Sequence, residues 1–451
     1  MPAATLRVLH FAAASVLPVL VALYVGATTF LGGTSIPWRP IMVDLDVYRL
    51  AGSVLLEGGD FYNLPGRLPF LYPPFAALLA VPLAVLPATP VQVAWTAVSA
   101  LALVAVLHRF GLTGWVLSLV ATATIFFVQP VVQTLGYGQL GIFLVALVAL
   151  DLVPGPRVLP RRLLPEGVLT GLATAIKLTP AIFLLYLLLA GRRRSFLVAA
   201  GSAVAATVLS AVIVPRASLD FWGRLAHGDT GLGHSLIYYT NQSVMADIVR
   251  ILGLGTGVSL LGLTASAVVG LLGVWAAVQW HRLGQVGLAV NLCGVAGLLA
   301  SPVSWLHHFV WVVPLGVSLA LAGRRGNLPL PRSMLVLGWV FVGWVAAAPR
   351  GLTDETRRLP NGADLEWQWL WFEHAVASVT AVVGIAFLAV AMVVATRLRS
   401  AETRAEPVQG SADGAEPLDP GSVRGTNGAE GPRSLPQSGD AVSGGSRLRG
   451  S

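Results

Sequence analysis

Long apolar segments follow one another along most of the chain and are separated by short polar loops. A bilayer core is crossed by roughly 20 apolar residues in helical conformation. The pattern predicts helices near 11–31, 91–107, 114–129, 138–153, 167–190, 195–214, 257–280, 286–300, 303–322, 333–348 and 373–396. We therefore predict an all-α, polytopic transmembrane protein of about 11 to 13 helices.

Two segments leave that number open. Residues 74–87 are apolar but short and bounded by prolines, so they form either a re-entrant segment or a full span. Residues 167–190 contain Lys177 and Pro180. Because proline removes a helical hydrogen bond and clashes with the preceding turn, we expect two short helices there.

The composition agrees with a membrane protein. Of the 451 residues, 55% are hydrophobic and 11% are charged, whereas a soluble domain has about 25% charged residues. The net charge of +8 does not indicate nucleic-acid binding, because the arginines lie in short clusters between apolar segments. The single cysteine, Cys293, excludes a disulfide framework within one chain.

Basic clusters orient the helices, since they mark the cytoplasmic ends of membrane spans. The clusters are Arg157/Arg161/Arg162, Arg192/Arg193/Arg194, His281/Arg282, Arg324/Arg325/Arg332 and Arg397/Arg399. The loops near 32–70, 130–139, 215–245 and 349–372 then face outward. We thus expect a plasma-membrane protein with both termini in the cytoplasm.

The two ends of the chain differ in character. The apolar stretch from Phe11 to Phe30 follows Arg7 and is long, so we interpret it as the first span and not as a signal peptide. Beyond about residue 400 the chain is rich in Gly, Ser, Pro and Glu. We predict a transmembrane domain at 1–400 and a disordered cytoplasmic tail at 401–451.

Asp44 and Asp46 lie just beyond the first apolar segment. Carboxylates at a bilayer boundary are costly to desolvate, which favours a functional role. In a helix Asp44 and Tyr48 share one face at a spacing of four, while Asp46 points elsewhere. Asp44 is therefore the candidate general base and Asp46 a possible second carboxylate. The alternative for both is a solvated loop or helix-cap residue.

Other polar residues gather in the predicted outer loops. Tyr72 precedes two prolines that form a rigid entry into the next segment. Gln139 follows Gly136-Tyr137-Gly138, and Asn241 and Gln242 follow a pair of tyrosines. Amides next to aromatic faces suit sugar binding, although ordinary turns and caps explain these residues equally well.

Three basic side chains lie within apolar segments. Lys177 needs a partner or water there, and a lipid phosphate is a natural partner for its ammonium group. His307 and His308 are adjacent, and neighbouring positions of a helix point about 100° apart, so they do not chelate one metal easily. Either histidine can instead contact a phosphate or orient a base, or be satisfied by a neighbour in the core.

These motifs, taken together and in this order, resemble one protein family. The chain is similar to the actinobacterial GT-C membrane glycosyltransferases of family GT87, the DUF2029 group, over about residues 10–400. The matching motifs begin at Val43-Asp44-Leu45, Phe70-Leu71-Tyr72, Tyr137-Gly138-Gln139, Lys177-Leu178-Thr179-Pro180, Asn241-Gln242-Ser243 and Ser301-Pro302 with the His307-His308 pair.

The resemblance implies a GT-C-like fold and an inverting transfer outside the membrane. Mannose would pass from polyprenyl-phosphate-mannose to a glycolipid or lipoglycan acceptor in α-1,2 linkage. The family's catalytic aspartate corresponds to Asp44, its lysine to Lys177 and its histidine pair to His307 and His308, while Asp46 has no firm counterpart. Tyr48, Tyr72, Gln139, Asn241 and Gln242 are further candidate contacts to substrate. No cofactor or metal site is expected, and metal dependence is left open.

Two other functions remain in view. A polyprenyl-phosphate-arabinose arabinofuranosyltransferase shares the family, and residue chemistry alone does not separate the two sugars. A lipid or solute transporter would use Asp44 and Lys177 for binding or coupling. That class places ionisable groups near the membrane midplane in paired repeats, and no internal repeat is evident here.

Overall fold

The computed structural model describes residues 3–30, 42–64, 68–159, 161–228, 236–324, 326–348 and 365–405. Within these ranges every regular element is a helix, and the single isolated β-bridge joins Asn241 to Trp305. The prediction of an all-α fold is confirmed. The predicted tail beyond residue 405 and most of the loop at 349–372 lie outside the described residues, so the predicted domain boundary stays a prediction.

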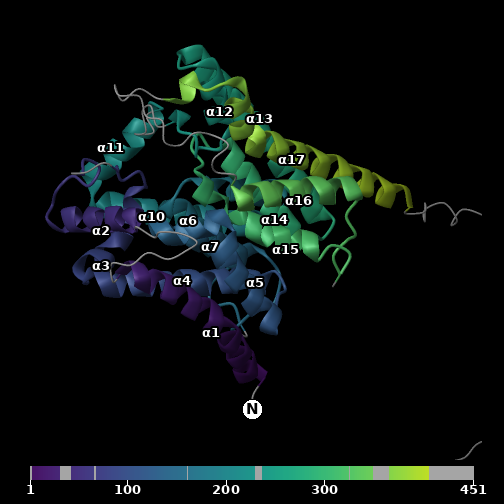
Figure 1. The fold of residues 1–451 in the computed structure, drawn as a ribbon, viewed down its shortest axis with the longest axis horizontal. Helices are drawn as coiled ribbons and strands as arrows, with labels where there is room; N and C mark the ends of the chain where they lie inside the picture. The colour runs from purple at the N-terminus through teal and green to yellow at the C-terminus, as the bar shows by residue number, and fades with distance from the viewer. Residues whose placement is uncertain are drawn as a thin grey trace, which may run out of the picture. The chain divides into compact units, whose positions relative to one another are not determined.

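The elements run in the following order (Figure 1). They are α1 (Ala3–Phe30), α2 (Val43–Leu56), α3 (Pro74–Val85), α4 (Ala88–Arg109), α5 (Gly114–Phe127), α6 (Gln129–Tyr137), α7 (Gly141–Leu152), α8 (Val168–Ile176), η1 (Thr179–Ala181), α9 (Ile182–Leu189), α10 (Arg193–Ile213), α11 (Pro215–Ala226), α12 (Val244–Leu252), α13 (Thr256–Arg282), α14 (Val286–Ala300), η3 (Leu306–Trp311), α15 (Val312–Ala320), α16 (Arg332–Ala347), η4 (Leu365–Gln368) and α17 (Trp371–Ala405).

Several helices are long and apolar enough to cross a membrane. Five helices meet this condition among the described residues, namely α1, α4, α10, α13 and α17. The pair α5 and α6 forms a sixth candidate that is bent by 75°. Shorter apolar helices, among them α7, α9, α14 and α15, fill the bundle between them. The chain is a multi-pass helical membrane protein.

Four helices were not expected from the hydrophobic pattern: α2, α6, α11 and α12. Each is short, and α2, α11 and α12 mix charged with apolar residues, so no long apolar segment marks them. The expected break in 167–190 is confirmed. Helix α8 ends at Ile176, Lys177 is extended with φ −148° and ψ 139°, and the chain resumes as η1 at Thr179.

Two apolar clusters hold the fold together. The larger one joins the central helices and contains Trp280, Phe309 and Phe341. The smaller one lies where α2 packs against α3, and it contains Tyr48, Tyr72 and several other aromatic residues (Figure 1). Leu45, Tyr48 and Ala51 of α2 are buried in this cluster against α3 and the aromatic side chains of Phe61 and Phe70.

A buried ionic network closes one end of the bundle. The carboxylate of Asp151 accepts hydrogen bonds from the backbone N–H groups of Gly167 and Thr170 and from the Thr170 hydroxyl, at 2.7–3.0 Å. Arg162 pairs with both Asp151 and Glu166. Asp151 therefore satisfies the free N–H groups at the start of α8 and fixes the preceding loop.

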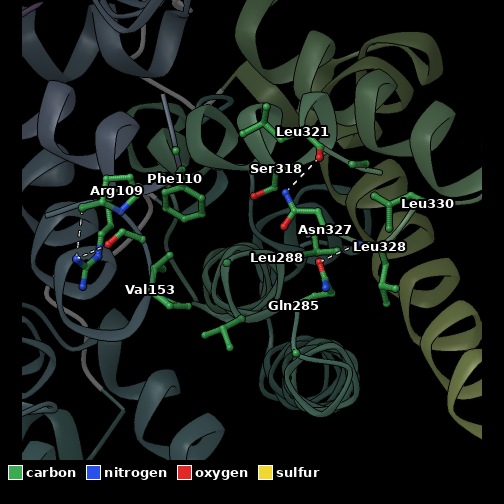
Figure 2. Close-up of a pocket in the computed structure, with 18 of the residues that line it drawn as sticks. Arg109, Phe110, Val153, Gln285, Leu288, Ser318, Leu321, Asn327, Leu328 and Leu330 are labelled. Carbon is green, nitrogen blue, oxygen red and sulfur yellow. Dashed lines mark hydrogen bonds between the residues drawn. The ribbon is translucent and has the colours of Figure 1, made fainter. Parts of the chain in front are cut away.

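A cavity of about 370 Å³ lies at the same end. Figure 2 shows Arg109 and Phe110 on one side of it, and Leu328 and Leu330 on the other. The guanidinium group of Arg109 donates to the carbonyl of Leu150 at 3.0 Å and to the carbonyls of Gly155 and Pro156 at 3.4 and 3.5 Å. The loop between α7 and α8 is thus attached to the end of α4.

Candidate functional site

The sequence around Gly138 sets the position of α2. The backbone N–H of Met42, just before α2, donates to the carbonyl of Gly136 at 2.7 Å. Gly138 ends α6 in the left-handed region with φ 70°, where a side chain is strained. A Cβ at Gly138 would also lie 2.6 Å from the Cβ of Leu45. Only glycine lets α6 and α2 approach this closely, and this contact places Asp44 beside Gln139.

Asp44 belongs to a network of polar side chains inside an aromatic cluster. Tyr48 and Tyr72 have their hydroxyl oxygens 2.9 Å apart, and these oxygens lie 3.1 and 3.2 Å from Oε1 of Gln139. At least one of the two hydroxyl groups donates to Oε1, which leaves the amide nitrogen of Gln139 to donate to the carboxylate of Asp44. The predicted pairing of Asp44 and Tyr48 on one face of a helix is confirmed.

The surroundings alter the acidity of Asp44. Burial raises its pKa from the usual 3.8 to about 6, while the hydrogen bond from Gln139 and the charge of Lys177 oppose that increase. A carboxyl group with this pKa is mostly ionised at neutral pH and still accepts a proton readily. Asp46 lies two residues further along α2 and is exposed, away from this network.

Lys177 reaches the same site from the break between α8 and η1. Its Nζ lies 2.8 Å from Nε2 of His308 and 5.2 Å from the centre of the Tyr72 ring. The other ring nitrogen of His308, Nδ1, accepts the backbone N–H of Trp305 at 3.2 Å. Because the backbone of Lys177 is extended and lies beyond the last turn of α8, its side chain does not point along a face of that helix.

Lys177 has a further property that the hydrophobic pattern does not show. It is the only lysine in a chain that otherwise carries arginine at every cationic position. Lysine presents a compact point charge on a flexible stem, whereas arginine presents a rigid planar fork. The fact that the single lysine of the chain lies within an apolar segment is therefore a further sequence signal that Lys177 is functional.

His307 is buried, and its ring packs edge-on against the ring of His308. Its carbonyl accepts a hydrogen bond from the Thr134 hydroxyl at 2.9 Å, and its ring packs edge-on against Tyr137 at 5.6 Å. Its Nε2 atom is buried and has no hydrogen-bond partner among the described residues. A buried polar atom of this kind is usually satisfied by water or by a ligand, so His307 retains a donor or acceptor for a third group.

Asn241 holds together the two loops that carry these residues. Its Oδ1 accepts the backbone N–H of Ser304 at 2.9 Å, and its Nδ2 donates to the carbonyls of Leu236 and Pro302 at 2.9 and 3.3 Å. The side chain is fully buried. Gln242 instead donates to the carbonyl of Tyr239 at 2.7 Å. Direct contact of either amide with substrate stays a prediction.

The structure therefore brings most of the predicted site residues together. Asp44, Tyr48, Tyr72, Gln139, Lys177 and His308 form one chain of contacts, with His307 adjoining it. Asn241 supports the segment that carries the histidines, and Asp46 lies outside. Sequence reasoning missed Thr134 and Trp305, because their contribution comes from contacts across the bundle and not from a local pattern.

Within the described ranges no group of three His, Cys, Asp or Glu side chains is arranged to hold a metal ion. The cavity of Figure 2 is also separate from this site. Helix α7 begins beside His307 and ends at the cavity, while α14 begins at the cavity and ends beside the Pro302 carbonyl that Asn241 contacts. A helix of 15 residues spans about 22 Å, so the cavity and the site lie at opposite ends of the bundle.

The fold and the site define a class: a multi-pass membrane protein with one carboxylate and one ammonium group collected among aromatic residues at one end of its helices. The family model for Glycosyltransferase family 87 matches residues 70–302, and the chain belongs to this family. The matched segment contains Gln139 and Lys177. It excludes Asp44, which the fold places against Gln139.

Curated relatives agree with this family. A Mycobacterium tuberculosis protein named polyprenol-phosphate-mannose-dependent alpha-(1-2)-phosphatidylinositol mannoside mannosyltransferase is 32% identical over 349 residues, which cover 68% of this chain and 78% of that protein. A second protein of the same species, named as the corresponding phosphatidylinositol pentamannoside mannosyltransferase, is 35% identical over 321 residues, 67% of this chain and 70% of its own length. No solved structure matches the chain.

The role of Asn241 as a loop anchor is testable. Asn241→Ala removes the acceptor of the Ser304 backbone N–H and the side-chain donor to the carbonyl of Leu236, and each such loss costs about 1–3 kcal/mol. We expect a lower midpoint of thermal unfolding and a lower rate of sugar transfer. Asn327→Ala, at the opposite end of the bundle, serves as the control with little effect. An unchanged unfolding midpoint with a raised KM would contradict anchoring and indicate direct binding of substrate.

Proposed function

We propose that the protein transfers mannose from polyprenyl-phosphate-mannose to a mannosylated lipid or lipoglycan, with inversion to an α-1,2 linkage. Two kinds of observation support this. The relatives are named for this donor and for phosphatidylinositol mannoside acceptors. The site contains a half-buried carboxylate within the electrostatic influence of an ammonium group. The second observation carries the proposal, because it supplies both groups that the reaction needs.

The reaction follows from these two groups. Asp44 accepts the proton of the acceptor hydroxyl while that oxygen attacks C1 of the donor mannose. The bond between C1 and the phosphate oxygen breaks, and polyprenyl phosphate leaves with the bonding electrons. The ammonium group of Lys177 stabilises the negative charge that develops on the phosphate. Nε2 of His308 lies 2.8 Å from Nζ of Lys177, so the His308 ring limits the positions that the lysine side chain can take.

One carboxylate is sufficient for this chemistry. Inverting transfer uses a single displacement, so a base is required on one side of the sugar and a leaving group on the other. A retaining mechanism would need a nucleophilic carboxylate about 5 Å from the acid-base residue. Asp46 is exposed and lies away from the network of Asp44, which favours inversion by a single base.

We further propose that the site faces the extracytoplasmic side of the plasma membrane. The arginine clusters support this orientation, since Arg109, Arg157 and Arg162 lie at the end of the bundle away from Asp44. Positive charge in short loops favours the cytoplasm. Both termini would then be cytoplasmic, and the polyprenyl-linked donor would supply the energy of the reaction without a nucleotide.

The proposal is tested by transfer with the purified protein in lipid. Polyprenyl-phosphate-mannose and polyprenyl-phosphate-arabinose are offered separately with a phosphatidylinositol mannoside, and we expect product from the mannose donor. Asp44→Asn should lower kcat by at least about 100-fold through loss of the base, while Asp46→Asn keeps most of the activity. Full activity of Asp44→Asn, or equal loss in both variants, would reject Asp44 as the base.

The pH dependence gives an independent test. A general base must be ionised, and the pKa of Asp44 is raised to about 6 by burial. We expect kcat/KM to fall about tenfold per pH unit below pH 6 and to level off above it. Gln139→Leu removes a hydrogen bond that lowers this pKa, so the acid limb should move to higher pH. A limb at the usual value near 3.8 would contradict the assignment.

Lys177 permits a direct chemical measurement because it is the only lysine. An amine-reactive ester modifies Lys177 and the N-terminal amine alone, and mass spectrometry separates the two. We expect polyprenyl phosphate to protect Lys177 while the N-terminal amine reacts as before. Lys177→Gln should also lower kcat by about 100- to 1,000-fold, the usual effect of losing one charge-stabilising group. Equal modification with and without polyprenyl phosphate would contradict a phosphate contact.

A further inference from the structure

Helix α11 follows the membrane span α10 after a single residue, Val214. Its side chains divide into three strips. Ser218 and Phe221 are buried against the protein, while the apolar side chains of Leu219, 75% exposed, and Trp222, partly exposed, lie three positions apart on another side of the helix. The third strip is charged and contains Arg216, Asp220, Arg224 and His227, which recur at intervals of three or four residues and therefore share one face.

An exposed apolar strip beside a charged strip is typical of a helix that lies in the membrane interface. The start of α11 places it at the site end of the molecule. Val214 and Ala217 pack against the aromatic cluster of α2 and α3, which contains Tyr48 and Tyr72. Figure 1 shows α11 near α2 and α3, in agreement with these contacts. The charged strip is therefore on the same side of the protein as the candidate site, on a helix whose pattern suits the membrane interface.

A short series of contacts connects α11 to the candidate base. The guanidinium carbon of Arg224 lies 4.8 Å from the centre of the Tyr62 ring, and the Tyr62 ring stacks on Phe221. The Tyr62 hydroxyl donates to the backbone carbonyl of Tyr72 at 2.9 Å. The Tyr72 hydroxyl in turn contacts Gln139, the neighbour of Asp44. The Tyr62 side chain therefore lies between Arg224 and Tyr72, a residue of the candidate site.

We propose that the charged strip of α11, centred on Arg224, binds the phosphodiester of a phospholipid-anchored acceptor while its terminal sugar reaches Asp44. This inference rests on the proposed function and assigns a headgroup subsite to it. A guanidinium stacked on an aromatic ring keeps its N–H edge free, and that edge matches a phosphate in a two-point hydrogen bond. Arg216 adds a second cation two turns away, and Asp220 between them suits the hydroxyl groups of a polyol headgroup.

Two acceptors separate this subsite from the catalytic site. One is a phosphatidylinositol mannoside, and the other is an alkyl α-mannoside that carries the sugar without a phosphate. Arg224→Gln should raise KM about tenfold for the phosphate-bearing acceptor, in line with the loss of a hydrogen bond to a charged group. KM for the alkyl mannoside and kcat for both acceptors should remain unchanged. Arg224→Lys, which keeps the charge, should show a smaller increase.

Arg193→Gln is the matched control. Arg193 is an exposed arginine at the other end of α10, away from α11, so its loss should change neither KM. An equal effect of Arg224→Gln on both acceptors would mean that Arg224 only supports Tyr62, and it would overturn the proposal. So would an unchanged KM for the phosphate-bearing acceptor.

A binding measurement separates this inference from the reaction itself. Short-chain phosphatidylinositol is titrated against the protein in detergent, and we expect Arg224→Gln to weaken its binding about tenfold, with Asp44→Asn unaffected. Retained binding without any transfer would reject only the proposed function. Transfer without any effect of Arg224→Gln would reject only the subsite. Equal binding of short-chain phosphatidylglycerol would indicate a general anionic-lipid contact and would also overturn the acceptor subsite.

Discussion

The cost of holding a carboxylate in an apolar, membrane-embedded protein governs the organisation of this molecule. Asp44 cannot stay ionised among aromatic side chains without polar partners. The chain supplies them from distant positions, with an amide from Gln139 and a positive charge from Lys177. Each partner is held by a break in regular structure, Gln139 just after the left-handed Gly138 and Lys177 at the extended residue between two helices.

The polar loops that complete the site are rigid because their own hydrogen bonds are satisfied internally. Asn241 and the backbone around it join the loop before α12 to the loop before η3. This connection holds Trp305 in place. The backbone N–H of Trp305 donates to Nδ1 of His308 and orients its ring, and His308 contacts Lys177. At the other end, Asp151 and Arg162 perform a similar function for the loop before α8. The bundle therefore has an ion-paired end, where the cavity of Figure 2 also lies, and an opposite end that holds the polar groups of the candidate site.

The proposed reaction and the proposed acceptor subsite assign different tasks to neighbouring parts of the structure. The groups proposed to act on the sugar are mostly buried within the bundle, where electrostatic interactions are stronger than in water. The groups assigned to the lipid headgroup lie on α11, whose exposed apolar and charged residues are typical of a helix in the membrane interface. Tyr62 and Tyr72 connect the two regions. This arrangement suits an acceptor that remains anchored in the membrane while its sugar end enters the site.

The sequence by itself determined the membrane class, most of the apolar helices, the break at Lys177 and the site residues as separate motifs, because hydropathy and helix breaking are local properties. It did not predict α2 or α11 as helices, since both are short and charged residues interrupt their apolar positions. Only the tertiary structure decided that Asp44 contacts Gln139, that Lys177 meets His308 and that Asp46 stays outside. The first two of these contacts join residues 95 and 131 positions apart, and no local pattern records which loops the folded bundle brings together.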